Sequence, residues 1–569
     1  MQEPERALYP HEQLPQETLA PVLQRYMAEA QHFPEREVVD WQHAPLKYKI
    51  YRGCACLRLA YLTPPASEAG AEQARQPFGG AQFGQMLADI YGLTRQRWTG
   101  AESYNAIAAG STLPILDPLK HPFKQDLLRP VPSGGGLYPC ELYAVIGPAQ
   151  ALPAGVYHYD PVHHALDVIQ DADARPEQSD RFLNRLLEAL LESPACAADF
   201  ALVLSCFFWK NAFKYGEFAY RLQGLDLGIV LGQSLAVGSY YGLKSSVHFR
   251  FVDSAINALL NLDEAYESAY AVIVFSLGDT PRGPRASLPR WQKGPTPQLR
   301  RTDGDERARL QPLSSLPLSA ALHHASLIKT RAQGQPTGQD QDAEGGLRGP
   351  LAGSSVALSD DIGLELARGT PLRHSARHYF RPGRISEQQC AQLLYAAGRG
   401  LQSDIAPAAP YLPRLLLYCI VAGVQGLDPG IYCYTPSARH WQLVRSGDSR
   451  LQLQQMVAHT GYHNVYHINL HIFPVGEYSE GVRRYGPRWY RIQNMLAGSV
   501  IQRLYLAAAL LGLGCHTSLA YSIEGVNNLL GLERGATALA QVLIAPERLA
   551  GQYYEIPLPA LPAAALPEG

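Results

Sequence analysis

The chain has few of the features that mark a nucleic-acid-binding or membrane-spanning protein. Its 49 Lys and Arg residues are nearly matched by 51 Asp and Glu residues, and no basic tract is long enough to follow a phosphate backbone. The amino terminus lacks a basic-then-apolar signal pattern, and the most apolar helix candidate, Leu504 to Gly514, is too short to span a bilayer. We therefore expect neither nucleic acid nor a membrane as a partner.

Cysteine and metal-ligand patterns are also sparse. Nine cysteines are scattered along the chain, and the closest pair, Cys54 and Cys56, has neither zinc-site nor redox-motif spacing. His463, His467 and His471 are spaced four apart, but no carboxylate or cysteine cluster accompanies them. No Walker-type Gly-Lys-Ser/Thr occurs. The sequence therefore predicts reduced thiols in a cytoplasmic protein without a metal site.

What the chain does have is length and a large apolar fraction. With 569 residues and 46% hydrophobic residues it exceeds what one core usually holds, so more than one domain is expected. Residues 281–360 are rich in Pro, Gly, Arg and Gln, which favours a largely flexible linker with one short helix near "LSAALHHASLI". The predicted division is a first domain over 1–280, this linker, and a second domain over 361–569.

The two predicted domains are related by an internal duplication. "KYGEFAYRLQ" from Lys214 and "RYGPRWYRIQ" from Arg484 share Tyr, Gly, Tyr, Arg and Gln in register. "FVDSAINALLNLD" from Phe251 aligns with "YSIEGVNNLLGLE" from Tyr521 at the same spacing, and "PAGVYHYDP" from Pro153 matches "DPGIYCYTP" from Asp428. Three matches in one order, at a period far longer than a solenoid repeat, indicate a duplicated domain.

Helical and strand patterns interleave within each copy. In the first copy the expected order is the helix "FGQMLADIYG", the strands "ELYAVI" and "GVYHYDP", a helix near "SDRFLNRLLEALLE", the strand "FALVLSCFF", a long helix through "GLDLGIVLGQSLAVGSYYG" and the strand "AYAVIVFSLG". Short hairpin-type links favour an antiparallel or mixed sheet. The predicted fold class is therefore α+β.

One stretch of the first copy stands out for its glycines. "RPVPSGGGLYPCELYAVI" places three consecutive glycines between Ser133 and a predicted strand. Glycine carries a large conformational-entropy cost, which is justified where the backbone turns sharply or approaches a ligand closely. From these residues alone, a tight turn before a strand and a ligand-contacting loop are equally good interpretations.

A family resemblance favours the second interpretation. The glycine stretch, "GVYHYDP", "KYGEFAYR" with "LDLG", and "FVDSAINALLNLD" occur in the order typical of FMN-dependent dehydrogenases of the SagB/McbC type, which have the nitroreductase fold. The resemblance covers roughly 82–278; the second copy, 371 to about 546, resembles the wider nitroreductase superfamily more loosely. These enzymes oxidise thiazoline and oxazoline rings of ribosomal peptides to thiazoles and oxazoles. In that family the Pro-Ser-Gly loop lies against the flavin, which implies cofactor contacts for Pro132, Ser133, Gly134, Gly135 and Gly136.

The resemblance also implies a catalytic pair, Lys214 and Tyr215. Aromatising an azoline requires a base for a ring Cα proton, while a hydride leaves Cβ for flavin N5. A lysine serves as that base near neutral pH only where burial or neighbouring charges lower its pKa. Tyr215 would orient the lysine or share the proton. The family usually continues with Glu-Arg-Gly, where this chain has Glu217, Phe218 and Ala219, so its pocket is expected to differ.

The flavin phosphate needs cationic or hydroxyl donors, which nitroreductase folds supply with an Arg-x-Ser-x-Arg pattern. The second copy has it in "RHSARHYF", so the resemblance implies phosphate contacts for Arg373, Ser375 and Arg377. The first copy offers only "RGCACLRL" as a counterpart, with Cys54 and Cys56 in place of the serine and the second arginine.

The second copy lacks the other half of the site. Ala408, Ala409 and Pro410 replace the glycine loop, and Arg484, which stays protonated, replaces Lys214. Family members are homodimers whose FMN sites combine the phosphate motif of one chain with the Pro-Ser loop of the other. The resemblance therefore implies an intramolecular pseudo-dimer with a single competent FMN.

The resulting functional prediction is an FMN-dependent oxidoreductase that dehydrogenates azoline rings in a ribosomal peptide pathway. Its expected substrate is a peptide or a small heterocycle, and cyclodehydratase proteins are candidate partners. Two alternatives stay open. An NAD(P)H-dependent nitro or quinone reductase would not need Lys214 and Tyr215, and a flavin-free scaffold subunit would account for the decayed motifs.

Overall fold

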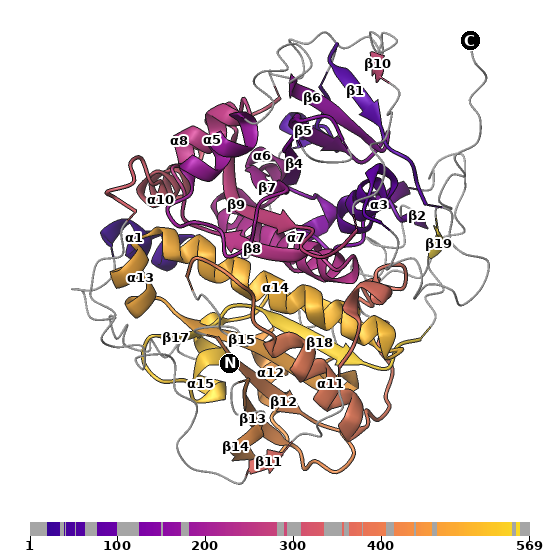
Figure 1. Ribbon diagram of the computed structural model, residues 1–569. Coiled ribbons are helices and arrows are strands. Elements are labelled where there is room, and N and C mark those ends of the chain that lie inside the picture. Colours follow the sequence, from indigo (N-terminus) through magenta and orange to yellow (C-terminus); the bar gives the residue numbers. More distant parts are fainter. Residues whose placement is uncertain are drawn as a thin grey trace.

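The computed structural model describes most of both copies. The described residues are 20–34, 39, 41–51, 53–62, 77–99, 124–148, 152–171, 181–281, 290–292, 309–334, 355–357, 363–377, 379–405, 415–436, 440–457, 464–548 and 553–557. The two copies form two lobes, each built around its own sheet, with two long helices lying between them (Figure 1). Ala408, Ala409, Pro410, Arg52 and His463 lie outside the described residues.

The first sheet has the strand order β10-β1-β6-β5-β4-β7-β9-β8. Its strands are β1 (Ala55–Arg58), β4 (Cys140–Ile146), β5 (Gly155–Asp160), β6 (Ala165–Asp171), β7 (Phe200–Phe207), β8 (Lys244–His248), β9 (Glu267–Ser276) and β10 (Arg290–Gln292). Neighbouring strands pair antiparallel. β4, β7 and β9 are buried along their whole length, as expected of central strands covered on both faces.

The second sheet repeats this order as β11-β14-β13-β12-β15-β18-β16, with β17 also paired to β15. Its strands are β11 (Ser355–Ala357), β12 (Leu416–Val421), β13 (Gly430–Thr435), β14 (His440–Ser446), β15 (Leu470–Glu477), β16 (Gly514–Ser518), β17 (Ala536–Ala538) and β18 (Gln541–Ala545). The shared order confirms the duplication, and the mixture of helices with antiparallel sheets confirms the α+β class.

Helices cover both sheets at positions that correspond between the lobes. The first lobe has α3 (Gly80–Tyr91), α5 (Arg181–Ala189), α6 (Trp209–Tyr215), α7 (Ala219–Tyr240) and α8 (Asp253–Leu259); the second has α11 (Glu387–Gly398), α12 (Arg450–Met456), α13 (Ser479–Tyr485), α14 (Arg488–Leu510) and α15 (Ile523–Leu530). The elements expected in the first copy are all present. The short helices α6 and α13 directly precede the long helices α7 and α14.

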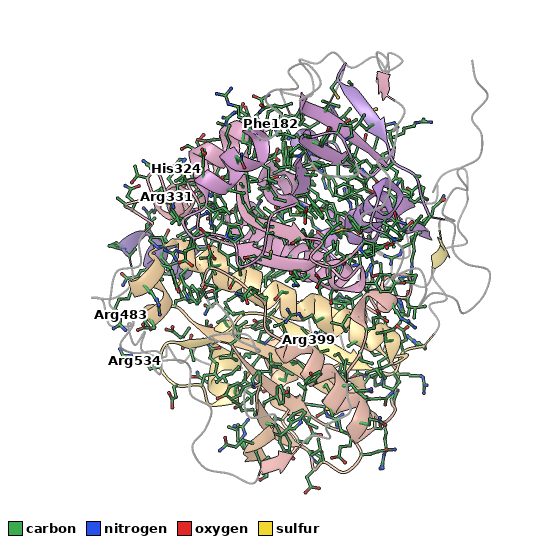
Figure 2. The ribbon with its side chains drawn as sticks, in the orientation of Figure 1. Phe182, His324, Arg331, Arg399, Arg483 and Arg534 are labelled. Carbon is green, nitrogen blue, oxygen red and sulfur yellow. The ribbon has the colours of Figure 1, made fainter. Side chains whose placement is uncertain are left out.

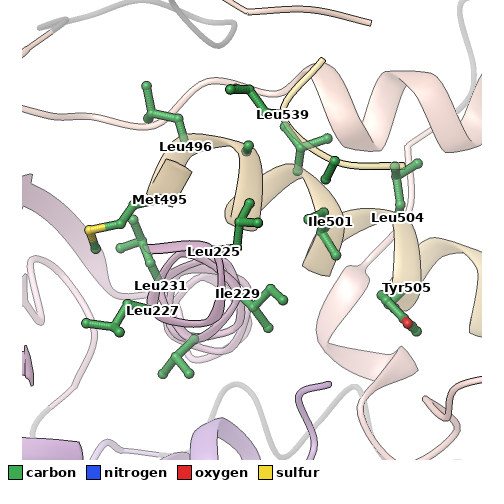
Figure 3. Close-up of a cluster of buried hydrophobic side chains, with 14 of the residues drawn as sticks. Leu225, Leu227, Ile229, Leu231, Met495, Leu496, Ile501, Leu504, Tyr505 and Leu539 are labelled. Carbon is green, nitrogen blue, oxygen red and sulfur yellow. The ribbon is translucent and has the colours of Figure 1, made fainter. Parts of the chain in front are cut away.

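The long helices α7 and α14 pack against each other in the centre of the molecule (Figure 3). Gly224, Gly228 and Gly232 are spaced four apart on α7 and so lie on one face. A Cβ atom on Gly228 would collide with the backbone of Met495, and one on Gly498 of α14 would collide with the carbonyl of Leu225. These glycines let the two backbones approach closely, which is what joins the lobes into an intramolecular pseudo-dimer.

The duplicated Tyr-Arg-Gln motif lies at this junction. Arg221 of α7 donates to Leu539 O of the second lobe at 2.9 Å, and Arg491 of α14 donates to Asp253 Oδ1 of the first lobe at 2.9 Å. Between them the rings of Tyr220 and Tyr490 stack with centroids 6.3 Å apart. The Tyr and Arg residues of the motif therefore contact the opposite lobe, whereas Gln223 and Gln493 bond within their own lobes.

Chain segments outside the two sheets also join the lobes. β19 (Tyr553–Pro557) follows the second lobe in sequence but pairs with β2 (Arg95–Thr99), which in turn pairs with β3 (Lys124–Leu128). The amino-terminal helix α1 (Pro21–Glu29) places the ring of Tyr26 against Tyr490 at 5.4 Å and donates from its hydroxyl to Glu217 O.

Residues 309–334 of the expected linker pack onto the first lobe. They contain the short helix predicted there, α10 (Pro317–Ser326), whose first turn is capped by Glu217: Leu318 N and Ser319 N donate to its carboxylate at 3.0 and 2.8 Å. Arg331, labelled in Figure 2, donates to the carbonyls of Glu188 and Leu190 at the carboxyl end of α5. Much of the remaining linker lies outside the described residues, and the domain boundaries stay predictions.

Three further observations concern disulfides, membrane spans and metal sites. All nine cysteines are free thiols. In the part of the chain that the structure describes, no helix is long and apolar enough to cross a membrane. Within those same ranges, no three His, Cys, Asp or Glu side chains are grouped so as to hold a metal ion; His467 lies in a 3-10 turn and His471 is buried in β15, bonded to Gln541.

Candidate functional site

The glycine loop forms a tight 3-10 turn immediately before β4. Gly135 and Gly136 have φ angles of 65° and 69°, in the left-handed region that side chains with a Cβ rarely adopt. Gly134 lies over Leu222 of α7, where an added Cβ would come within 3.3 Å of a methyl group. The backbone conformation alone therefore requires glycine at two of the three positions.

A buried aspartate on α7 holds this loop in place. Ser133 Oγ donates to Asp226 Oδ2 at 2.7 Å, and Gly134 N donates to Asp226 Oδ1 at 3.2 Å. Tyr138 N in turn donates to Ser133 Oγ at 2.9 Å. Burial raises the pKa of Asp226 to about 7, against the lowering effect of these hydrogen bonds. The Gly134 N–H, expected to face a cofactor, is thus engaged within the protein.

Lys214 and Tyr215 end helix α6 beside the loop. The Tyr215 hydroxyl lies 2.7 Å from the point where a Cβ on Gly135 would stand, so a side chain there would displace the tyrosine. Lys214 Nζ lies 4.9 Å from the centroid of the Tyr215 ring, a cation–π arrangement, and both side chains are half-buried. The predicted catalytic pair and the glycine loop are therefore brought together.

Arg373 reaches the same region from the second lobe. It is buried, and its Nη2 donates to Arg129 O at 2.9 Å, three residues before Pro132. Ser375 Oγ donates to the Tyr505 hydroxyl at 3.3 Å, and that hydroxyl also accepts from Thr517 N at 3.0 Å. The Arg-x-Ser part of the predicted motif thus reaches across the junction between the lobes, and Arg373 contacts the segment that leads into the glycine loop.

Arg377 belongs to a second cationic group. Its φ of 52° is left-handed, an uncommon conformation for a residue other than glycine. Burial raises the pKa of the neighbouring Tyr379 hydroxyl, and three guanidinium groups act against that rise: those of Arg377, Arg548 and Arg97. The predicted motif therefore places Arg373 over the ring of Tyr505 and Arg377 near Tyr379.

These features fit a ligand that has an anionic phosphate end and a planar ring. Guanidinium and hydroxyl groups of 373–377 are suitable phosphate donors. The Gly135–Gly136 bend, with no Cβ atoms, leaves backbone exposed beside Tyr215 for a flat ring.

One expected counterpart is wrong. "RGCACLRL" was matched to the Arg-x-Ser-x-Arg stretch, but its core forms strand β1, with Cys56 opposite Asp167 of β6 and Trp291 of β10. In the second lobe the strand in the same sheet position is β11, paired to β14, and it precedes Arg373 in sequence. The two segments are alike because both combine Arg with small residues. The position of a strand within its sheet depends on its partner strands, so one segment does not indicate it.

Sequence reasoning also missed several residues of the site. Asp226 stood within the quoted "LDLG", but nothing in its helical segment indicates that it faces the loop. Arg129 is fully buried, with its guanidinium carbon 3.9 Å from the Tyr91 ring centroid. Burial acts to lower the pKa of Arg129, but Tyr91 and Glu141 outweigh it and raise the pKa. Arg97 and Arg548 come from opposite ends of the chain, so no local motif could have joined them.

Comparison with known proteins identifies the fold family of the chain. The model of the nitroreductase family matches residues 106–278 and 372–545. A crystal structure described as that of a nitroreductase from Anabaena variabilis superimposes with a TM-score of 0.67 at 22% identity, covering 93% of this chain and 99% of the other.

Two curated relatives match shorter stretches. The trifolitoxin-processing protein TfxB of Rhizobium leguminosarum bv. trifolii is 34% identical over 152 residues, 26% of this chain and 40% of TfxB. The microcin B17-processing protein McbC of Escherichia coli is 30% identical over 169 residues, 29% of this chain and 59% of McbC. The chain thus spans about half the length of the curated relatives it matches.

Proposed function

This chain belongs to the nitroreductase family, and on that premise we propose that it is an FMN-dependent dehydrogenase of azoline rings in a ribosomally made peptide. The observation that carries the proposal is the convergence of two lobes on one place. Arg373 from the second lobe bonds to Arg129 O, and the glycine loop three residues further on contacts Tyr215 of the first lobe. Each lobe supplies what one flavin needs at one of its ends.

The similarity to TfxB and McbC supports the substrate class. Both relatives are named as processing proteins, of trifolitoxin and of microcin B17 respectively. The apolar surroundings of the pair add to this: Leu137, Phe213 and Tyr215 belong to one hydrophobic cluster beside the loop. Such a wall suits an uncharged five-membered heterocycle better than a charged metabolite.

Bound FMN would supply a two-electron acceptor for the hydride. The chain's own residues then have three tasks. Lys214 Nζ, as the neutral amine, takes the proton from the ring Cα, and the Tyr215 ring, whose centroid lies 4.9 Å away, orients the lysine side chain. Asp226 fixes the glycine loop, which would contact the flavin ring. Arg373 and Ser375 would bind the phosphate. The substrate loses one proton and one hydride per turnover, and dioxygen or another acceptor finally takes the electrons.

The test combines cofactor stoichiometry with a matched pair of variants. Purified protein should be yellow with one FMN per chain. Lys214→Ala should keep the colour and lose about 100-fold or more in turnover of an azoline peptide, the usual contribution of a positioned base. The control is Arg484→Ala, at the equivalent position of α13, which should leave turnover unchanged.

Three results would contradict the proposal. Two FMN per chain with equal affinity would show that the two lobes form two complete sites instead of one. A colourless protein would favour a scaffold role. Rapid flavin reduction by NADPH, with no effect of Lys214→Ala, would favour a nitro or quinone reductase.

A further inference from the structure

A group of buried charges lies directly beneath helix α6. It consists of Lys49, Glu141, His158, Asp167, Lys210 and Glu267, here called the buried charge network. Five of the side chains are exposed by 3% or less, and Lys49 by 19%. They come from β4, β5, β6, β9, α6 and the segment 41–51, here called the strap. Nothing in the proposed chemistry uses them.

The network is internally balanced. Glu141 Oε2 and Asp167 Oδ2 lie 3.0 and 3.2 Å from the two ring nitrogens of His158. Ionised carboxylates only accept hydrogen bonds, so both nitrogens donate and the ring is an imidazolium. Burial acts to lower the pKa of His158, but the two carboxylates outweigh it and raise the pKa. Three cations then match three carboxylates, which is how buried charges are tolerated.

Lys210 links this network to the site. Its Nζ lies 2.9 Å from Glu141 Oε1 and donates to Lys47 O of the strap at 3.0 Å. Lys210 stands four residues before Lys214, one turn earlier on the same face of α6. Next to it, Trp209 Nε1 donates to His43 O of the strap at 2.7 Å.

The strap is fastened to the same network by its own lysine. Lys49 Nζ lies 2.5 Å from Glu267 Oε2 and 2.7 Å from the Tyr143 hydroxyl. Burial acts to lower the pKa of Lys49, but Glu267 and Tyr51 outweigh it and raise the pKa. Helix α6 is therefore held between the sheet below and the strap beside it.

The equivalent helix of the second lobe is held in another way. Ladder register places Leu416, Cys433, Gln442 and Ala536 where the first lobe has Glu141, His158, Asp167 and Glu267. Lys210 corresponds to Glu480 of α13. The start of α13 is capped by Glu477, the last residue of β15: Ser479 Oγ and Glu480 N both donate to Glu477 Oε2 at 2.9 Å. The same fold thus forms without the network.

Stability alone gives no reason to keep the network. A buried ion pair is often no more stabilising than apolar residues of similar volume, because desolvation offsets the attraction. A seven-residue helix has little intrinsic stability, so its position depends on what it is tied to. The Lys210 ammonium is held at two points, by the Glu141 carboxylate and by the hydrogen bond to Lys47 O, and apolar packing would supply neither.

We propose that Lys210, bound to Glu141, is a positioning residue that sets the place of α6 so that Lys214 and Tyr215 meet the glycine loop. This inference rests on the proposed function. Lys210 acts through its own helix, and Glu141 acts through Lys210. The strap, tied in by Lys49, closes the other side of the helix and is part of the same support.

The experiment compares single, conservative and apolar double variants of the full chain. Lys210→Met and Glu141→Gln should each lower kcat about 10- to 100-fold, as expected for a displaced catalytic group, with KM and FMN content within about threefold of wild type. Lys210→Arg, which can still bind Glu141 through its guanidinium, should recover most of kcat. Glu480→Met is the matched control on α13 and should leave kcat unchanged.

The double variant Glu141→Leu/Lys210→Met separates positioning from stability. It imitates the apolar sheet of the second lobe, so its melting temperature should return close to that of wild type while kcat stays low. Wild-type kcat in this double variant, or in Lys210→Met, would overturn the inference. If a single variant does not fold, the double variant and Lys210→Arg decide the matter by the same criteria. An active Lys214→Ala protein would instead overturn the proposed function itself.

Discussion

The two lobes share a strand order but differ in what lies beneath their short helices. Under α6 the first lobe buries three carboxylates and three cations, whereas the matching sheet positions under α13 are Leu416, Cys433, Gln442 and Ala536. The same strand order forms with either set of residues. Of the two lobes, the one with the buried charge network is the one that carries the glycine loop and the predicted catalytic pair. Because burying charges costs desolvation free energy, this placement favours a role of the network in the site rather than in the fold.

A second contrast concerns the long helices. Asp226 of α7 clamps the glycine loop, and the equivalent residue of α14 is Leu496. A comparable carboxylate does exist in the second lobe: Asp404 accepts from Phe249 N and Arg250 N at 3.0 and 2.8 Å. It ties down a strand end at the lobe junction instead of a loop. Similar buried chemistry thus has different uses in the two lobes.

Apart from Lys214→Ala, the largest effect is expected where the lobes contribute jointly to one site. Arg373→Ala removes a buried guanidinium from the phosphate end, and should weaken FMN binding about 10- to 100-fold, the range for a charge-assisted hydrogen bond. FMN affinity measured by flavin fluorescence gives the answer. Arg483→Ala, an exposed arginine of α13 labelled in Figure 2, should have no effect. Unchanged affinity in Arg373→Ala would mean that the second lobe does not hold the cofactor.

A pH-dependent effect of intermediate size is expected at Asp226. Its pKa is raised to about 7, so as pH falls through 7 the carboxylate gains a proton and loses one acceptor for the loop. Turnover of the wild type should therefore decline below pH 7, and the corresponding inflection should vanish in Asp226→Asn. The rate profile between pH 5 and 9 checks this expectation.

The pH dependence of stability in the same variant, Asp226→Asn, can also be predicted in direction. Because folding raises the pKa of Asp226 above its unfolded value, ionisation costs stability as pH rises from about 4 to 7 and no more above that. The melting temperature of Asp226→Asn relative to wild type should rise over that window. Asp404→Asn is the control, since burial also raises the pKa of Asp404 to about 7. It should show the stability trend without losing the rate inflection.

The smallest effect is expected from the cap of α13. Glu477→Gln weakens the acceptor for Ser479 and Glu480, and should lower the free energy of unfolding by about 0.5–2 kcal/mol. Denaturant unfolding measures that loss, and turnover should stay at the wild-type level. A fall in turnover like that of Lys210→Met would remove the distinction drawn between α6 and α13.

Much of the fold was accessible from the sequence because its information is local. Short apolar runs marked β4 and β7, long apolar helical runs marked α7 and α14, and the recurring Tyr-Arg-Gln motif marked the duplication. Gly135 and Gly136 indicated a special backbone conformation, which their φ angles confirm. Each of these signals depends on a few neighbouring residues and on backbone sterics.

The tertiary structure alone decided which distant side chains meet. The bond from Arg373 to Arg129 O joins residues of different lobes, the clamp of Asp226 on Ser133 joins a helix to a loop, and the match of "RGCACLRL" to β11 is a matter of sheet position. The sequence around Lys210 does not distinguish it from other helical lysines, and only the fold places it against Glu141. Contacts of this kind depend on how the lobes and layers pack, and packing is a property of the whole chain.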